Sequence, residues 1–242
     1  METPTPFIYK IDEYGNSFAT DNPEWKVYIQ NVRYNLFLER SGIPEFYWNI
    51  NFENYVGNKK SVEFRKIKHY AEHLNEKQFS HVHLYLWGNQ GCQKSALACN
   101  IGKSAIKKGL KVKFILAGDL IDTLMKIQGY NNNSELVKEI EELKTTYDLI
   151  IVDDVADAEK ALMWNSSNKS LIISEWDRLF RKILYNGTNI VMTSNFSIEN
   201  CKQYFSTSIY EMLDRNMEKI HLTESVKEIR KLKVQSAFEG II

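Results

Sequence analysis

Apolar and polar positions along the chain form blocks that predict strands separated by helices. Short apolar runs predict strands in HLYLW (83–87), KVKFILA (111–117), DLIIVDD (148–154) and NIVMTSN (189–195), and the last two are continuous runs typical of strands buried on both faces. Apolar residues at helical spacing fill the segments between and beside them, over residues 94–109, 118–126, 134–146 and about 172–185. Because strands that alternate with helices form parallel sheets, we expect an α/β fold with a mostly parallel central sheet flanked by helices.

The N-terminal part of the chain has a weaker pattern. Residues 1–45 are aromatic and polar, and we expect either a short arm that docks a partner or the edge of the main domain. The main α/β core is expected to span residues 46–242. Before the first apolar run, the spacing of Ile67, Tyr70 and Ala71 predicts a helix that begins near Ser61 and buries one face.

Composition narrows the classes of protein that fit. The chain has 242 residues and a formal net charge of zero, so no overall basic field marks it as a nucleic-acid binder and any such contact needs a local patch. Its three cysteines, Cys92, Cys99 and Cys201, form no CxxC pair, which favours reduced thiols inside the cell and no zinc site. No long apolar run and no signal-like N-terminus are present, so we expect a cytoplasmic protein without membrane contact.

A candidate phosphate-binding turn follows the first apolar run. It matches G-x-x-x-x-G-K-[ST] in all but one defined position, through Gly88, Asn89, Gln90, Gly91, Cys92, Gln93, Lys94 and Ser95. Backbone N–H groups of such a loop point at phosphate oxygens, Lys94 would neutralise the β- and γ-phosphates, and the Ser95 hydroxyl group would bind Mg²⁺. The motif therefore predicts ATP and Mg²⁺ as cofactors; the alternative is a strand-to-helix turn with a chance Lys-Ser pair.

Gln93 stands where the motif has its second glycine. Glycine at that position allows a positive φ and a close approach of the backbone to the phosphates. A glutamine can still adopt a turn, with its side chain directed outward or against a phosphate. We expect it to weaken or retune nucleotide binding rather than abolish it.

Polar side chains follow two later apolar runs. Asp153 would hold Mg²⁺ through the metal's water shell, and Asp154 would orient or deprotonate the attacking water. Asn195 would hydrogen-bond the γ-phosphate or that water. The alternatives are a solvated Asp-Asp turn and an Asn turn residue. The carboxyl ends of parallel strands meet at one edge of the sheet, so we expect all three beside the phosphate-binding turn.

With these motifs in order, residues 33–230 resemble the AAA+ ATPases of the DnaC/DnaI helicase-loader and IstB group. The resemblance is carried by RSGIPEFYWNINFENY, YLWGNQGCQKSALA, VKFILAGDLIDTL, YDLIIVDDVADAE and NIVMTSNFSIE. It implies a P-loop NTPase (AAA+) fold and an ATPase that loads a replicative DNA helicase, binds single-stranded DNA in an oligomer and releases its partner on hydrolysis. A low-turnover ATP-binding switch and an IstB-like transposition helper are the alternatives.

The resemblance also implies two roles for basic residues near the C-terminus. Arg215 matches the arginine finger, which reaches ATP on a neighbouring subunit and implies self-association through the ATP site. The alternative is a surface arginine paired with Asp214 or Glu218. Lys227 matches a sensor-II cation, with Arg230 as the second choice. Loaders of this group carry a larger N-terminal helicase-binding module than the 45 residues here.

Candidate contacts to single-stranded DNA are weaker signals. Five lysines could bind phosphates, namely Lys103, Lys107, Lys108, Lys111 and Lys113. Tyr130 and Trp164 could stack on bases. The alternative for each lysine is an ordinary solvated position. His81 and His83 alternate along a strand and are expected to be edge residues, with no metal site.

Overall fold

The computed structural model describes residues 3–128, 134–155, 169–202 and 206–224. Its strands are β1 (Phe7–Ile11), β2 (Ser17–Asp21), β3 (His83–Trp87), β4 (Val112–Leu116), β5 (Leu149–Asp153), β6 (Asn189–Ser194) and β7 (Met217–His221). Its α-helices are α1 (Pro23–Arg40), α2 (Val62–His73), α3 (Lys94–Lys107), α4 (Ala117–Gln128), α5 (Ser134–Thr145), α7 (Lys169–Tyr185), α8 (Ile198–Cys201) and α9 (Thr207–Asn216). Two 3₁₀ turns, η1 (Glu45–Tyr47) and η2 (Lys77–Phe79), complete the elements described here.

The central sheet has the strand order β4-β5-β6-β3-β7, and its neighbouring strands pair in parallel. The prediction of a mostly parallel sheet is confirmed. The sequence did not predict β7, because only Met217 and Ile220 of its five residues are buried. Since β7 pairs with β3, β3 lies inside the sheet, and the prediction that His83 is an edge residue is wrong.

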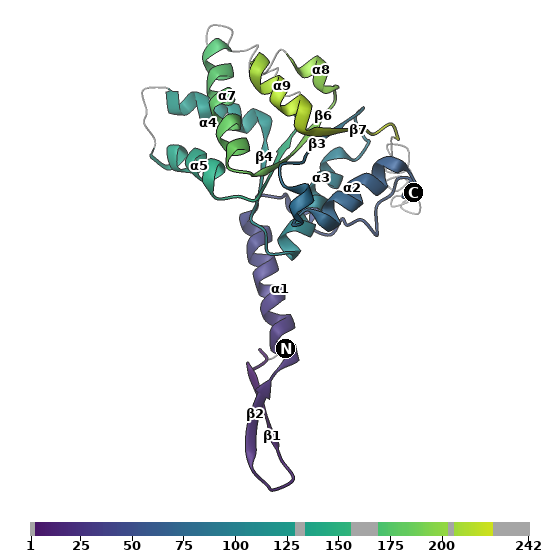
Figure 1. Ribbon diagram of the computed structural model, residues 1–242, viewed down its shortest axis with the longest axis vertical. Coiled ribbons are helices and arrows are strands. Elements are labelled where there is room, and N and C mark those ends of the chain that lie inside the picture. The colour runs from purple at the N-terminus through teal and green to yellow at the C-terminus, as the bar shows by residue number, and fades with distance from the viewer. Residues whose placement is uncertain (1–2, 129–133, 156–168, 203–205, 225–242) are drawn as a thin grey trace, which may run out of the picture.

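Helices cover both faces of the sheet (Figure 1). On one face, α4, α5, α7 and α9 pack over a core that contains Tyr85, Val152 and Met192. On the other face, α2 and α3 pack over a core that contains Leu86 and Ile151. Neighbouring residues of one strand thus belong to different cores, which is why these strands read as continuous apolar runs.

Local signals fix the helix ends. The Ser61 side chain accepts a hydrogen bond from Phe64 N (3.1 Å) and caps α2, which begins where the sequence predicted a helix. After α3, Gly109 adopts φ +82° and Leu110 N donates to Ala105 O (3.1 Å), which closes the helix in a Schellman-type turn. Helix α5 begins at Ser134, the first residue of the helix predicted there.

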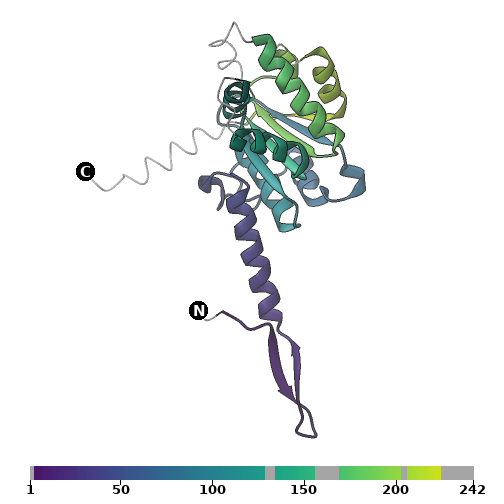
Figure 2. The same cartoon turned by 90° about the vertical axis from the view of Figure 1, so that its left-hand side faces the viewer.

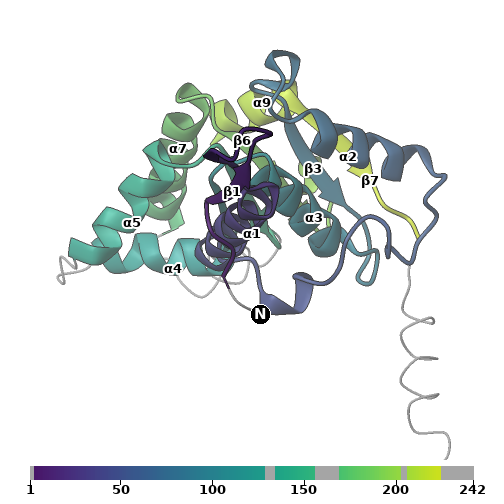
Figure 3. The same ribbon diagram turned by 90° about the horizontal axis from the view of Figure 1, so that it is seen from below.

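Residues 3–40 form a hairpin and a helix that extend away from the core (Figures 1 and 2). Strands β1 and β2 pair antiparallel, and Asn22 then caps α1, accepting from Glu24 N (3.0 Å) ahead of Pro23. Only the last turns of α1 reach the core, where Leu38 is buried. Seen from below, the hairpin and α1 project in front of the sheet and its helices (Figure 3).

The described residues include no helix that is both long enough and apolar enough to span a lipid bilayer.

Candidate nucleotide-binding site

A polar cavity of about 190 Å³ lies at the carboxyl ends of β5 and β6, beside the turn that leads from β3 into α3. The residues that line it and that the sequence singled out are Gln90, Gly91, Gln93, Lys94, Ser95, Asp153, Asp154 and Asn195. The structure therefore brings the phosphate-binding turn and the polar ends of the two following buried strands together, as expected for a parallel sheet.

The backbone of the turn depends on residues that tolerate a positive φ. Gly88 has φ +147°, and a Cβ atom there would lie 2.1 Å from the carbonyl oxygen of Leu222, so no other residue fits without moving the end of β7. Gly91 has φ +91°. Gln93 immediately precedes α3 and adopts φ +59° and ψ +25°, the left-handed conformation that glycine normally takes.

Lys94, the first residue of α3, points back into the loop. Its ammonium group donates to the carbonyl oxygens of Gly88 (2.8 Å) and Asn89 (3.0 Å) and to Asn195 Oδ1 (3.0 Å). The residue is only 8% exposed. A buried ammonium group that points back into a glycine-containing loop at the start of a helix lies where the oxygens of a polyphosphate would bind.

The two carboxylates at the end of β5 are held by β6. Thr193 Oγ1 donates to Asp153 Oδ1 (2.5 Å) and accepts from Asp154 N (2.9 Å). Asp153 is buried, whereas Asp154 is partly exposed and has φ +53°. The left-handed backbone at Asp154 turns the chain away from the strand, so the adjacent carboxylates occupy different positions in the cavity.

Gln93 carries a second local cost beside its backbone conformation. Its Nε2 atom is buried and has no hydrogen-bond acceptor among the described residues. A buried amide donor without an acceptor destabilises the folded state, and a phosphate oxygen in the cavity would satisfy it. Strain and an unpaired donor in one residue are features of a ligand site rather than of a structural turn.

The donor set fits ATP with magnesium. Ser95 supplies a hydroxyl group and Asp153 a carboxylate, the oxygen ligands that Mg²⁺ prefers when phosphates and waters complete its shell. Among the described residues no cluster of three or more His, Cys, Asp or Glu side chains could hold a metal ion.

Arg215 lies apart from this cavity. It occupies the last turn of α9, is 78% exposed and makes a long ion pair with Glu211 (3.9 Å), not with the Asp214 or Glu218 considered from the sequence. The two candidate sensor-II cations, Lys227 and Arg230, lie outside the described residues.

The five candidate DNA-binding lysines differ in environment. Lys103 is 5% exposed, and its ammonium group donates to the carbonyl oxygens of Tyr47, Trp48 and Ile50, so it is not a surface contact; burial lowers its pKa to about 8. Three others are exposed or partly exposed but engaged: Lys107 with the Tyr34 ring, Lys108 with Glu72 O and Asn75 Oδ1, and Lys113 with Glu139. The Lys111 side chain is exposed, and Tyr130 and Trp164 lie outside the described residues.

His83 is a structural residue. It is 1% exposed, its Nδ1 atom accepts from Ile190 N (3.1 Å), and desolvation, with a smaller contribution from His81, lowers its pKa to about 4. His81 precedes β3 with φ +63°.

Besides Ala96, two residues that line the site were not assigned from the sequence. Tyr47 lines the cavity from η1, more than forty positions before the phosphate-binding turn, and Thr193 binds both aspartates. The position of Tyr47 in the GIPEFYWN segment was the only available signal. Sequence spacing alone does not show which strand neighbours Asp153.

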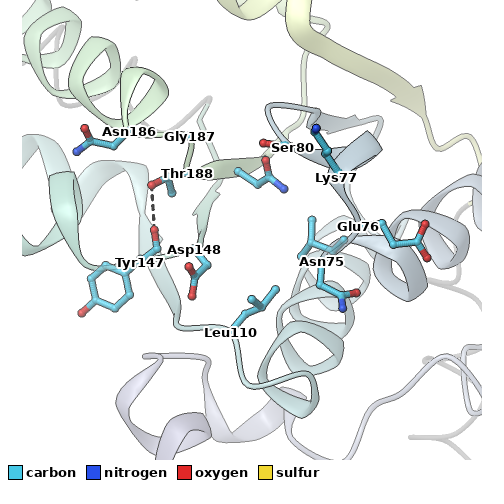
Figure 4. A pocket seen from close by; sticks show the side chains of 12 residues that line it. Asn75, Glu76, Lys77, Ser80, Leu110, Tyr147, Asp148, Asn186, Gly187 and Thr188 are labelled. Carbon is cyan, nitrogen blue, oxygen red and sulfur yellow. Dashed lines mark hydrogen bonds between the residues drawn. The ribbon is translucent and has the colours of Figure 1, made fainter.

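A larger cavity, about 420 Å³, lies at the other end of the sheet, near the amino ends of β5 and β6 (Figure 4). Several of its polar groups are already hydrogen-bonded: Thr188 Oγ1 donates to the carbonyl oxygen of Tyr147 (2.9 Å), which also lines the cavity, and Asp148 accepts from the Lys111 backbone N–H group (2.7 Å). Size alone therefore does not mark the functional site.

The loop, the buried lysine and the carboxylates on a parallel sheet define a P-loop ATP-binding protein of the AAA+ type. The family model of the IstB-like ATP binding proteins matches residues 49–237. The chain belongs to this family.

Individual relatives agree with this assignment. The chain is 33% identical over 122 residues to the replicative helicase loader DnaC of Buchnera aphidicola subsp. Baizongia pistaciae, and 31% identical over 123 residues to that of subsp. Schizaphis graminum. Each match covers 49% of this chain and 47% of the relative, so the chain spans about half the length of the curated relatives it matches.

Solved structures show the same fold. A DnaC helicase loader has a TM-score of 0.54 at 18% identity, with 74% of this chain and 99% of that chain covered. DnaI has a TM-score of 0.56 at 16% identity, with 75% and 92% covered. The initiator DnaA bound to AMPPCP and single-stranded DNA has a TM-score of 0.59 at 18% identity, with 81% and 56% covered.

Proposed function

We propose that this protein is an ATPase that loads a replicative DNA helicase onto DNA. It binds ATP with Mg²⁺ and single-stranded DNA in an oligomer, and hydrolysis releases the helicase. The observation that carries the nucleotide part is the buried Lys94 ammonium group, held among loop carbonyls and Asn195 in the cavity that Ser95 and Asp153 also line. The DnaC relatives support the loader part.

Each group has a separate role in hydrolysis. The loop amides and Lys94 bind the β- and γ-phosphates, and Ser95 and Asp153 hold magnesium, which supplies charge neutralisation when bound. Asp154 accepts a proton from the attacking water or orients it. Asn195 hydrogen-bonds the γ-phosphate or the same water, and its existing bond to Lys94 keeps its amide oriented.

The arginine finger comes from a second copy of the chain. Arg215 is exposed at the end of α9 and does not line its own cavity, which suits a residue that reaches the ATP of a neighbouring subunit. ATP then joins subunits, because a triphosphate in one copy binds Arg215 of the next. Lys227 is the proposed sensor-II cation.

The helicase docks on the N-terminal arm, residues 1–45, and the ATPase core follows from residue 46. Phe7, Tyr9 and Ile11 share one face of the hairpin and are 52%, 76% and 75% exposed. Exposed apolar side chains gathered on one face are typical of a protein-binding surface. The arm therefore offers an apolar surface on which a protein partner can dock.

A second candidate is an ATP-binding switch with little turnover. Two features favour it: Gln93 replaces a glycine of the turn, and the carboxylate that would orient the attacking water is that of an aspartate, Asp154, whose side chain is one methylene shorter than a glutamate. A third candidate, a helper ATPase in transposition, is favoured by the IstB-like family match.

Two measurements separate these candidates. Co-purification of the full chain with its replicative helicase, with and without ATP, should give an ATP-dependent complex; capture of a transposase instead would favour the helper. Steady-state ATPase activity should rise with single-stranded DNA. Tight ATP binding without turnover, even with DNA present, would favour the switch.

A further inference from the structure

A second polar cavity lies on the outer side of α3, where α1 joins the core. It has a volume of about 150 Å³, comparable with the 190 Å³ of the nucleotide-binding cavity. Its walls come from α1, from residues 48–53 and from α3. None of the residues assigned to ATP or magnesium lines it.

Asn100 is the unusual residue in this wall. It lies in the middle of α3 and is 2% exposed, and neither its Nδ2 nor its Oδ1 atom has a hydrogen-bond partner among the described residues. Buried carboxamides are almost always paired, so an unpaired one indicates a missing partner. An occupant that offers one acceptor and one donor side by side would satisfy both atoms.

Aromatic rings form the sides of the cavity. Tyr34 comes from α1 and Trp48 from the segment after η1. The Trp48 indole group donates to Ile43 O (2.8 Å), which fixes the plane of its ring. A fixed indole and a phenol ring offer flat surfaces on which a planar group can stack.

The two lysines that line the cavity differ in their ability to bind a ligand. The Lys103 ammonium group is already bound by backbone carbonyls, so it contributes positive potential but few further hydrogen bonds. The Lys107 ammonium group is exposed, lies 5.9 Å from the Tyr34 ring centroid and has no ion pair among the described residues. Glu53 also lines the cavity, so an anionic group would sit toward Lys107 and an amino group toward Glu53.

We propose that this cavity binds one nucleotide of a single-stranded nucleic acid. The edge of its base pairs with the Asn100 carboxamide, its ring stacks on Tyr34 or Trp48, and its phosphate lies near Lys107. A peptide backbone also presents a donor beside an acceptor, but it has neither a planar ring for these aromatic walls nor a phosphate for Lys107. The proposal rests on the proposed function in one respect only: the bound nucleotide is taken to belong to a single strand of DNA and not to be a free mononucleotide.

The test measures binding of a labelled oligodeoxynucleotide of mixed sequence by fluorescence anisotropy, with the full chain. Asn100→Leu removes the carboxamide at similar volume, and Lys107→Gln removes the exposed charge without touching the core. Lys126→Gln is the matched control, an exposed lysine outside the cavity and outside the set of candidate DNA-binding lysines. An abasic strand of equal length and free deoxynucleoside monophosphates complete the set.

We expect Asn100→Leu to weaken oligonucleotide binding by about 5- to 20-fold while the melting temperature stays the same or rises. Lys107→Gln should weaken binding by about 3-fold and reduce the salt dependence by about one phosphate, and Lys126→Gln should behave as the wild type. The abasic strand should bind less tightly. Free monophosphates that bind and respond to Asn100→Leu would support the site with a free nucleotide as its source.

The proposal is overturned if Lys107→Gln matches Lys126→Gln and the abasic strand binds as well as the intact one, or if a folded Asn100→Leu binds normally. The same measurements are repeated in a Lys94→Ala background to separate this cavity from the ATP site. The effects of Asn100→Leu and Lys107→Gln on oligonucleotide binding should persist in that background. If Lys94→Ala does not affect ATP binding, the proposed nucleic-acid site is not contradicted. If the Asn100 and Lys107 variants bind oligonucleotides normally, the proposed ATP site is not contradicted.

Discussion

Thr193 joins the ends of two strands, because its hydroxyl group donates to Asp153 and accepts from the Asp154 amide. The sequence predicted both aspartates as site residues, since adjacent carboxylates after a buried apolar run are conspicuous. It could not predict their common partner. That depends on β5 lying beside β6, which residue spacing does not reveal.

The strained conformation of Gln93 leads to a prediction for a single substitution. Gln93→Gly should raise the free energy of unfolding without nucleotide by about 1 kcal/mol, because relief from the left-handed conformation and from the unpaired amide outweighs the extra flexibility of glycine. For a chain of this size that corresponds to a rise of about 3 °C in the melting temperature, measurable by calorimetry.

The matched control for this change is Gln90→Gly in the same loop. Gln90 does not have a positive φ, so glycine there should lower stability. Equal effects of the two substitutions would show that Gln93 is not strained.

At the scale of helices and strands, the sequence located the buried elements accurately and missed elements with exposed surfaces. The core strands β3, β5 and β6 were located within one or two residues because both of their faces are covered. Strand β7 was missed because three of its five residues are exposed. Helix α1 was missed because its first turns pack against no other part of the core, so its apolar residues show no single buried face.

The pairing of β3 with β6 carries a pH-dependent contribution through His83, whose pKa falls to about 4 on burial. The folded state binds this proton more weakly than the unfolded state, so the stability it contributes is present above pH 6.5 and is lost as the pH falls toward 4. We expect the wild type to lose about 2 kcal/mol of stability between pH 7 and pH 5 through this residue.

Urea unfolding at pH 7 and pH 5 measures this loss, with His83→Gln as the comparison because glutamine can accept from Ile190 N but does not titrate. The variant should lose less stability than the wild type over the same interval. Parallel losses would assign the acid sensitivity to other groups.

At the scale of the whole molecule, the arm and the core are predicted to have separable tasks. Tyr9→Ser with Ile11→Ser should abolish co-purification with the replicative helicase, because it removes most of the exposed apolar face of the hairpin. ATP binding, measured by calorimetry, should not change. Lys10→Ser, on the opposite face of β1, is the control and should retain the complex. If the Tyr9→Ser, Ile11→Ser variant also retains the complex, the arm is not the docking surface.

The proposed contact of Arg215 with ATP on a neighbouring subunit can be tested by substitution. Arg215→Ala should lower ATP turnover by at least about 100-fold while single subunits still bind ATP, because the arginine acts on the neighbour's transition state. Arg178→Ala, another exposed arginine in a helical ion pair, should leave turnover unchanged.

Mixing Arg215→Ala with Lys94→Ala gives a direct readout of action between subunits. Interfaces between an intact Lys94 site and an intact Arg215 should restore part of the turnover. A mixture no more active than its components would place Arg215 outside the neighbouring site.

The central claim is that the Lys94 ammonium group binds the phosphates of ATP in the loop between β3 and α3. Calorimetric titration of ATP with magnesium into Lys94→Ala and wild-type protein tests it most directly, with Lys111→Ala as the control for loss of an exposed charge. The account predicts that Lys94→Ala folds and binds ATP at least about 100-fold more weakly, while the control binds normally. A folded Lys94→Ala with wild-type affinity would contradict it.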